Sequence, residues 1–201
     1  MTTSAIILAS GASSRFGDQD KLLASLHGRP VIQYVLDGLQ SLGLQQIVVV
    51  ISPESRLPAA LEATSFDNLT WVVNQRAAEG MGTSIVAGMA QLSPCDAVFI
   101  VLGDMPFIGQ TVYKSLSAIM HGPSAPDIVV PVYNGHKGHP VLFSARCFGE
   151  LVLLRGDRGG ASLLSSGQYR VAQYVAYTNA ILQDIDTVED LRAAEKIAFK
   201  G

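Results

Sequence analysis

Short apolar runs alternate along this chain with longer amphipathic segments. The apolar runs predict strands at 5–9, 46–51, 70–73, 97–102, 128–133 and 139–143, with shorter strands near 170–176 and 182–185. Helical periodicity marks the segments 30–42, 54–63, 83–92, 109–120, 159–166 and 188–199. Strands that alternate with helices are typical of an α/β fold, so we predict a mainly parallel sheet with helices packed against it.

The composition describes an ordinary globular chain. It has 201 residues, of which 48% are apolar and 15% charged, so we expect one domain spanning 1–201. The net charge of -3 and the singly scattered basic residues predict no nucleic-acid partner. The apolar runs are too short to cross a membrane, and the first residues lack the basic region of a signal peptide. We therefore expect a cytoplasmic protein with no membrane partner.

Cysteine and histidine spacing does not favour a transition-metal site. Cys95 and Cys147 form no C-x-x-C pair, which predicts two buried free thiols. His136 and His139 lie close together, but no third ligand is near them in the sequence.

The loop after the first predicted strand has the composition of a phosphate-binding site. Residues 10–14 (SGASS) are all small, so their backbone N–H groups can approach an anion, and Arg15 and Lys21 follow as cations. Gly11 and Gly17 do not have the spacing of a P-loop or of a dinucleotide-binding fingerprint. The alternative is a plain connection with two solvated cations.

Carboxylates follow two further apolar runs. Asp104 comes after 97–102 and Asp186 after 181–185, and the carboxyl ends of strands meet at the ligand-binding edge of an open α/β sheet. Mg²⁺ is commonly held by one or two carboxylates together with phosphate oxygens, so Asp104 and Asp186 are candidate ligands. A turn aspartate is the alternative for Asp104, and Asp184 is the rival of Asp186. Thr187 and Asp190 have the spacing of a helix capping box.

Six segments together resemble a known family. They are 8–17 (LASGASSRFG) followed by Lys21, 80–84 (GMGTS), 103–107 (GDMPF), 138–143 (GHPVLF), 156–159 (GDRG) and 184–187 (DIDT). The first resembles the signature of nucleotidyltransferases with a MobA-like domain, and the others occur in the order seen in molybdenum cofactor cytidylyltransferases. The resemblance implies a Rossmann-like three-layer nucleotidyltransferase fold with a mainly parallel mixed sheet.

The resemblance also implies roles for individual residues. Lys21 and Arg15 would be catalytic, Asp104 and Asp186 would hold Mg²⁺, and His139 and Asp157 would bind the acceptor. The nucleotide would be bound by Leu8, Ala9, Ser10, Gly11, Lys21, Asn74, Gly82 and Ser84. Simpler alternatives exist for some of these positions: a plain helix start at 80–84, a structural imidazole at His139 and a solvated turn at Asp157.

The implied reaction transfers CMP from CTP to the phosphate of molybdopterin, the molybdenum cofactor, and releases pyrophosphate. A phosphate monoester has a second pKa of about 6 and needs no protein base, which agrees with the lack of a convincing Ser/His/Asp arrangement or activated cysteine. Ser10 departs from both the LAAG of typical cytidylyltransferases and the LAGG of guanylyltransferases. A guanylyltransferase, a transferase for another phosphorylated acceptor, or a non-catalytic cofactor carrier remain alternatives. A molybdoenzyme or its chaperone would be a further partner.

Overall fold

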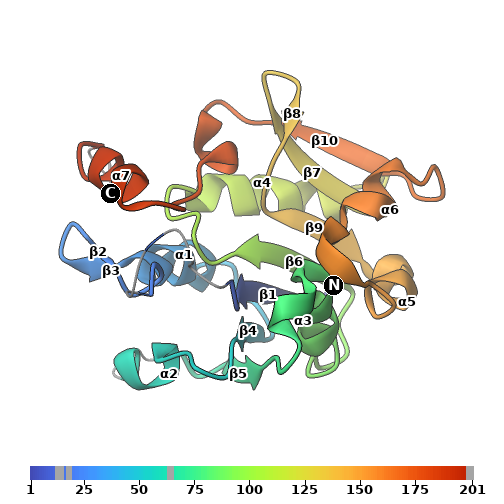
Figure 1. Cartoon of the computed structure of the whole chain (residues 1–201). Helices are drawn as coiled ribbons and strands as arrows, with labels where there is room; N and C mark the ends of the chain where they lie inside the picture. The colour runs from blue at the N-terminus through green and yellow to red at the C-terminus, as the bar shows by residue number, and fades with distance from the viewer. Residues whose placement is uncertain (12–15, 17–19, 63–65, 198–201) are drawn as a thin grey trace.

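One eight-stranded sheet forms the centre of the protein in the computed structural model, which describes residues 1–11, 16, 20–62 and 66–197 (Figure 1). The strands lie in the order β10-β7-β9-β6-β1-β4-β5, with β8 paired to β7. Only β8 and β9 run antiparallel to their neighbours in this sheet. The predicted mainly parallel mixed sheet is therefore confirmed. The strands are β1 (Thr3–Ala9), β4 (Ile47–Ile51), β5 (Leu69–Val73), β6 (Ala97–Leu102), β7 (Ile128–Tyr133), β8 (His136–Lys137), β9 (Val141–Ser144) and β10 (Val171–Val175).

Helices cover both faces of this sheet, which gives three layers (Figure 1). On β1, the side chains of Ala5 and Ile7 pack in one apolar cluster with α1 and α4, whereas Ile6 packs in a second cluster with α3. Both faces of β1 are thus buried, which explains its unbroken apolar run. The first cluster contains residues of α1 (Val31–Gln40), α2 (Leu57–Ala60) and α4 (Gln110–Met120); the second contains residues of α3 (Met81–Met89), α5 (Phe148–Leu151) and α6 (Ala161–Ser165).

A third apolar cluster joins the N-terminal part of the chain to its C-terminal part. It contains Leu26 of β2 (Ser25–Leu26), Val31 after β3 (Arg29–Pro30), Ala194 of α7 (Val188–Ala194) and the fully buried Ile185. Figure 1 shows α7 beside the β2–β3 hairpin. This packing brings the segment that contains Asp186 close to the segment that contains Lys21.

The predicted strand at 182–185 is wrong. The 3-10 helix η4 (Asn179–Leu182) ends at the first residue of this segment, and the described residues 183–187 belong to no strand. The Ile181 carbonyl accepts a hydrogen bond from His139 N–H, and Ile185 N–H donates to the Asp104 carbonyl. The two buried isoleucines therefore anchor the segment to two different neighbours. Gly138 permits the first contact, because a Cβ at this position would overlap the Ile181 carbonyl oxygen.

Several helices are shorter than predicted, and some short elements were not predicted. The segments 54–63 and 159–166 contain only α2 and α6, and residues 63–65 and 198–199 of the predicted helices lie outside the described residues. The unpredicted elements are β2, β3, β8, α5 and the 3-10 helices η1 (Ala77–Glu79), η2 (Ala145–Cys147) and η3 (Gly156–Arg158). Among the described helices, none has both the length and the apolar character that crossing a bilayer requires.

Candidate active site

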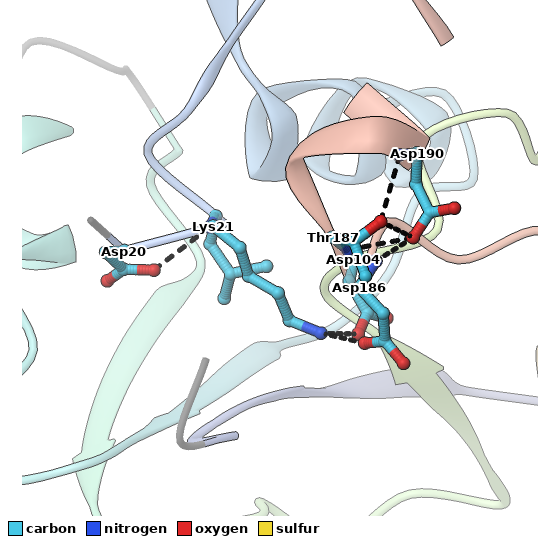
Figure 2. Close-up of polar contacts among 7 residues, drawn as sticks. Asp20, Lys21, Asp104, Asp186, Thr187 and Asp190 are labelled. Carbon is cyan, nitrogen blue, oxygen red and sulfur yellow. Dashed lines mark hydrogen bonds and ion pairs between the residues drawn. The ribbon is translucent and has the colours of Figure 1, made fainter. Parts of the chain in front are cut away.

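Lys21 lies between two carboxylates at the carboxyl edge of the sheet. Its Nζ donates to Asp104 Oδ2 and to Asp186 Oδ1, and both distances are 2.6 Å (Figure 2). Asp104 follows β6, Asp186 precedes α7, and Lys21 follows the loop after β1. The Lys21 side chain is only 11% exposed. The structure thus brings together three predicted site residues from distant parts of the chain.

The charges of this group influence one another. Burial would lower the pKa of Lys21, but the charge of Asp104 and the hydrogen bonds to Asp104 and Asp186 outweigh burial and raise it above its ordinary value. Lys21 is therefore an ammonium at neutral pH. Burial raises the pKa of Asp184, and the charges of Asp186 and Asp104 raise it further, while Lys21 acts in the opposite direction. The single positive charge of Lys21 therefore does not balance the negative charge of the carboxylates around it.

The carboxylates also fit a divalent cation. One oxygen each of Asp104, Asp184 and Asp186 lies within 4.8 Å of the others. Asp104 Oδ1 is buried and has no hydrogen-bond partner among the described residues. Carboxylate oxygens are the ligands that Mg²⁺ prefers. The exposed Asp184 belongs to the same group as Asp186, so both remain candidates for the second ligand.

A capping box orients the backbone around Asp186, as the sequence predicts. Asp190 Oδ2 accepts hydrogen bonds from the backbone N–H groups of Asp186 and Thr187, at 3.2 and 2.8 Å. In return, Thr187 Oγ1 accepts from Asp190 N–H at 3.1 Å. Figure 2 shows Asp190 and Thr187 beside Asp186 at the start of the last helix. Asp190 thereby holds the start of α7 and the adjoining Asp186 backbone in place.

Replacing Asp190 with asparagine is expected to lower the free energy of unfolding by about 0.5–1 kcal/mol, the scale of a weakened helix cap. The hydrogen bonds from Thr187 hold the pKa of Asp190 below its ordinary value, so this stabilisation is present near neutral pH and is lost as the pH falls through that lowered pKa. Urea denaturation at pH 7 measures the loss. The exposed Glu189, in the same turn, provides the control Glu189→Gln. A stability equal to that of the control would contradict the role of the cap.

A cavity of about 320 Å³ opens beside Lys21. Its wall includes the end of β1 and the following loop, the carboxylates near Lys21, and the start of α3. The residues with predicted roles that line it are Leu8, Ala9, Ser10, Gly11, Lys21, Ser84, Asp104 and Asp157, and Asp184 and Met81 line it as well. Arg15 lies outside the described residues. We name this space the first cavity.

Two residues predicted to bind nucleotide, Asn74 and Gly82, are not among the described residues that line the first cavity. Asn74 is buried and donates to the side-chain oxygens of Thr83 and Ser84, at 2.9 and 3.0 Å. A Cβ on Gly82 would lie 2.9 Å from the Gly156 carbonyl oxygen, so this glycine allows η3 to pack against α3. Asn74 is therefore linked to the first cavity through Ser84, which lines it. Gly82 is linked to the same cavity through η3, because η3 carries the lining residue Asp157.

A second cavity, of about 480 Å³, adjoins the first and shares Met81 and Asp157 with it. His139 lies in its wall, as predicted for an acceptor-binding residue, and Lys137 supplies a cation. Burial lowers the pKa of His139, although a backbone hydrogen bond at Ile100 and the charge of Asp104 act in the opposite direction. The imidazole is therefore neutral at pH 7. Most of the remaining wall is apolar and includes Ile85, Ile100, Val141, Phe143 and Leu164.

Lys137, Met81 and Leu22 are among the residues of these walls that had no predicted role as site residues. Lys137 directly precedes the 138–143 segment, and Met81 lies within the 80–84 segment. These positions were the available signals in the sequence. The sequence does not show that Met81 lies between the two cavities, because the place of Met81 depends on how η3 packs against α3.

These features define a class of site. A small-residue loop after the first strand, a lysine and clustered carboxylates meet at the strand ends where α/β proteins bind nucleotides. The family model for the MobA-like NTP transferase domain matches residues 5–173. The chain therefore belongs to this family of nucleotidyltransferases.

Individual relatives extend this similarity over nearly the whole chain. The chain is 31% identical over 195 residues to the purine catabolism protein PucB of Bacillus subtilis (strain 168), covering 92% of each chain. It is 26% identical over 192 residues to the molybdenum cofactor cytidylyltransferase of Escherichia coli (strain K12), covering 95% of this chain and 94% of the relative. The crystal structure of the Rv0371c homologue from Mycobacterium sp. strain JC1 superposes with a TM-score of 0.82 at 26% identity, covering 98% of each chain.

Proposed function

We propose that this protein transfers CMP from CTP to the phosphate of molybdopterin, giving molybdopterin cytosine dinucleotide and pyrophosphate. The observation that carries the proposal is the pair of adjoining cavities that share Asp157 and Met81. The first has the small-residue loop and Lys21 for a triphosphate, and the second has room for an acceptor. The choice of CTP and molybdopterin is supported by the resemblance of the ordered motifs to cytidylyltransferases and by the Escherichia coli relative.

A divalent cation is part of the proposal because of the charge of the site. Among the described residues, the ionisable side chains that line the first cavity are Lys21 and three carboxylates, those of Asp104, Asp157 and Asp184. A triphosphate is itself anionic, so it would be repelled unless a cation came with it. Asp104 and Asp186 would hold Mg²⁺, which when bound neutralises phosphate charge and polarises the phosphate oxygens.

The residues of the chain would align two phosphates for an in-line displacement. An oxygen of the acceptor phosphate forms a bond to the α-phosphorus, while the bond from that phosphorus to the bridging oxygen breaks and pyrophosphate leaves with the electron pair. The acceptor is largely a dianion at neutral pH, and so it needs no base. Lys21 and Arg15 would stabilise the charge that develops; one cation 4 Å from a phosphate oxygen contributes at most about 4 kcal/mol at an effective dielectric constant of 20.

Pyrophosphate release tests the proposal directly. The purified protein would be mixed with Mg²⁺, molybdopterin and one of the four common nucleoside triphosphates, with and without molybdate. Release is expected with CTP and molybdopterin together, and not when either is omitted. A sugar phosphate in place of molybdopterin serves as the acceptor control. Release with the sugar phosphate alone would overturn the acceptor, and a preference for GTP would overturn the nucleotide while leaving the transfer chemistry intact.

Replacing Ser10 with glycine is expected to relax the preference for CTP over GTP. The Ser10 side chain lies in the wall of the first cavity, and its removal makes room for a larger base. A change of this size in a pocket alters discrimination by about 10- to 200-fold at most. The measurement is the ratio of kcat/KM for the two nucleotides in both proteins. An unchanged ratio would show that Ser10 does not limit the size of the base.

A further inference from the structure

A chain of polar contacts connects the buried Asn74 to the wall of the first cavity. Asn74 Nδ2 lies 3.0 Å from Ser84 Oγ, and Ser84 Oγ lies 2.7 Å from Ser10 Oγ. Asn74 is 4% exposed and Ser84 is 2% exposed, whereas Ser10 is half-buried and lines the cavity. The chain therefore runs from the protein interior to a hydroxyl that can meet a ligand.

The backbone fixes the orientation of the Asn74 amide. The Arg76 N–H group lies 2.9 Å from Asn74 Oδ1, and a backbone N–H can only donate. Oδ1 is therefore the acceptor end, and Nδ2 donates its two hydrogens to the hydroxyls of Thr83 and Ser84. Thr83 in turn donates to a backbone carbonyl, since its Oγ1 lies 2.8 Å from Arg76 O and 2.9 Å from Gly80 O.

This orientation determines the direction of the contact between the two serines. Ser84 Oγ accepts from Asn74 and still has one hydrogen to donate. Among the described residues, the acceptor in contact with Ser84 Oγ is Ser10 Oγ, and a buried hydroxyl hydrogen without a partner is unfavourable. Ser84 thus donates to Ser10. The Ser10 hydrogen is then left for the cavity.

We propose that Asn74 is a positioning residue that, through Ser84, orients the Ser10 hydroxyl as a hydrogen-bond donor to a carbonyl oxygen of the nucleotide base. The inference rests on the proposed function, because it requires a nucleotide in the first cavity. Cytosine, uracil and guanine each carry a ring carbonyl, but adenine carries an exocyclic amine instead. The three residues therefore select against ATP, while the volume at Ser10 separates CTP from GTP.

Asn74→Asp tests the direction of the contacts, because it keeps the shape of the side chain and reverses its hydrogen bonding. A carboxylate can only accept, so Ser84 would donate to position 74, and Ser10 would donate to Ser84. Ser10 would then present a lone pair to the ligand. We expect CTP affinity to fall about five- to tenfold, the scale of one hydrogen bond, and the ratio of CTP to ATP affinity to fall at least as much. Isothermal titration calorimetry with Mg²⁺ measures both affinities without any acceptor.

Matched variants separate this effect from a general loss of structure. Thr83→Val removes the other hydroxyl to which the Asn74 amide donates. The contacts from Asn74 through Ser84 to Ser10 remain, so the ratio of CTP to ATP affinity should change less than twofold. Ser84→Ala adds no charge and should lower the ratio even if Asn74→Asp fails to fold. An unchanged ratio in Ser84→Ala would overturn the proposal.

Inorganic tripolyphosphate distinguishes a base contact from a phosphate contact. Ser10→Ala should weaken CTP and leave tripolyphosphate unchanged if the hydroxyl meets the base. Equal weakening of both ligands would show that it meets a phosphate, and the inference would fail while the proposed function stood. A parent protein that binds no nucleoside triphosphate at all would instead overturn the proposed function.

Discussion

Replacing Lys21 with alanine is expected to lower nucleotidyl transfer by about two to three orders of magnitude. Lys21 is the cation among the described residues that line the first cavity, and its ammonium lies 2.6 Å from both Asp104 and Asp186. In the proposed reaction, its loss removes a charge that would stabilise the pentavalent phosphorus and the departing pyrophosphate. The measurement is kcat/KM for pyrophosphate release at saturating Mg²⁺.

The same variant should bind a divalent cation more tightly when no nucleotide is present. In the parent protein the Lys21 ammonium competes with a cation for the two carboxylates, and alanine removes this competitor. Titration with Mn²⁺, followed by electron paramagnetic resonance, measures this affinity. Lys114→Ala, at an exposed position of α4, is the control and should change neither quantity. Transfer by Lys21→Ala within threefold of the parent would contradict the role assigned to Lys21.

Asp104→Asn is expected to lower transfer at least about 100-fold, the scale of losing one group that stabilises the transition-state charge. The substitution keeps the shape of the side chain but removes the charge that would hold Mg²⁺. Only 18% of the Asp104 side chain is exposed, and its Oδ1 has no hydrogen-bond partner among the described residues, so a cation is the group best suited to it. Metal-dependent CTP affinity should fall together with the rate, and calorimetry measures that affinity.

The second metal ligand can be identified by comparing two neighbouring carboxylates. Asp186→Asn should lower the rate in the same direction as Asp104→Asn, because Asp186 Oδ1 shares the Lys21 ammonium with Asp104. Normal turnover by Asp186→Asn with a defect in Asp184→Asn would assign the ligand to Asp184. Glu189→Gln, at an exposed position, is the control and should leave metal affinity unchanged, whereas Asp190→Asn is expected to alter stability more than the rate.

The sequence by itself determined the main elements of the fold and the part of the first cavity that is formed by the end of β1 and the loop after it. The strand β1 is apolar on both faces, and this local pattern is sufficient to predict a buried strand of a mainly parallel sheet. The capping box of Thr187 and Asp190 was also predictable, because it joins residues only three positions apart. Leu8, Ala9, Ser10 and Gly11 line the first cavity because a loop that directly follows a central parallel strand opens at the ligand-binding edge.

Only the tertiary structure decided how these parts meet. Lys21 lies 83 positions from Asp104 and 165 from Asp186, and their contacts depend on the packing of Ile185 in the third apolar cluster. The predicted strand at 182–185 failed for the same reason: Ile185 and the neighbouring Ile181 are buried, and their backbones bond separately to Asp104 and to His139. Asn74 and Gly82 were predicted to bind the nucleotide, yet Asn74 donates a hydrogen bond to Ser84 and Gly82 makes room for η3. Apolar periodicity reports which side chains are buried; their partners depend on the path of the whole chain.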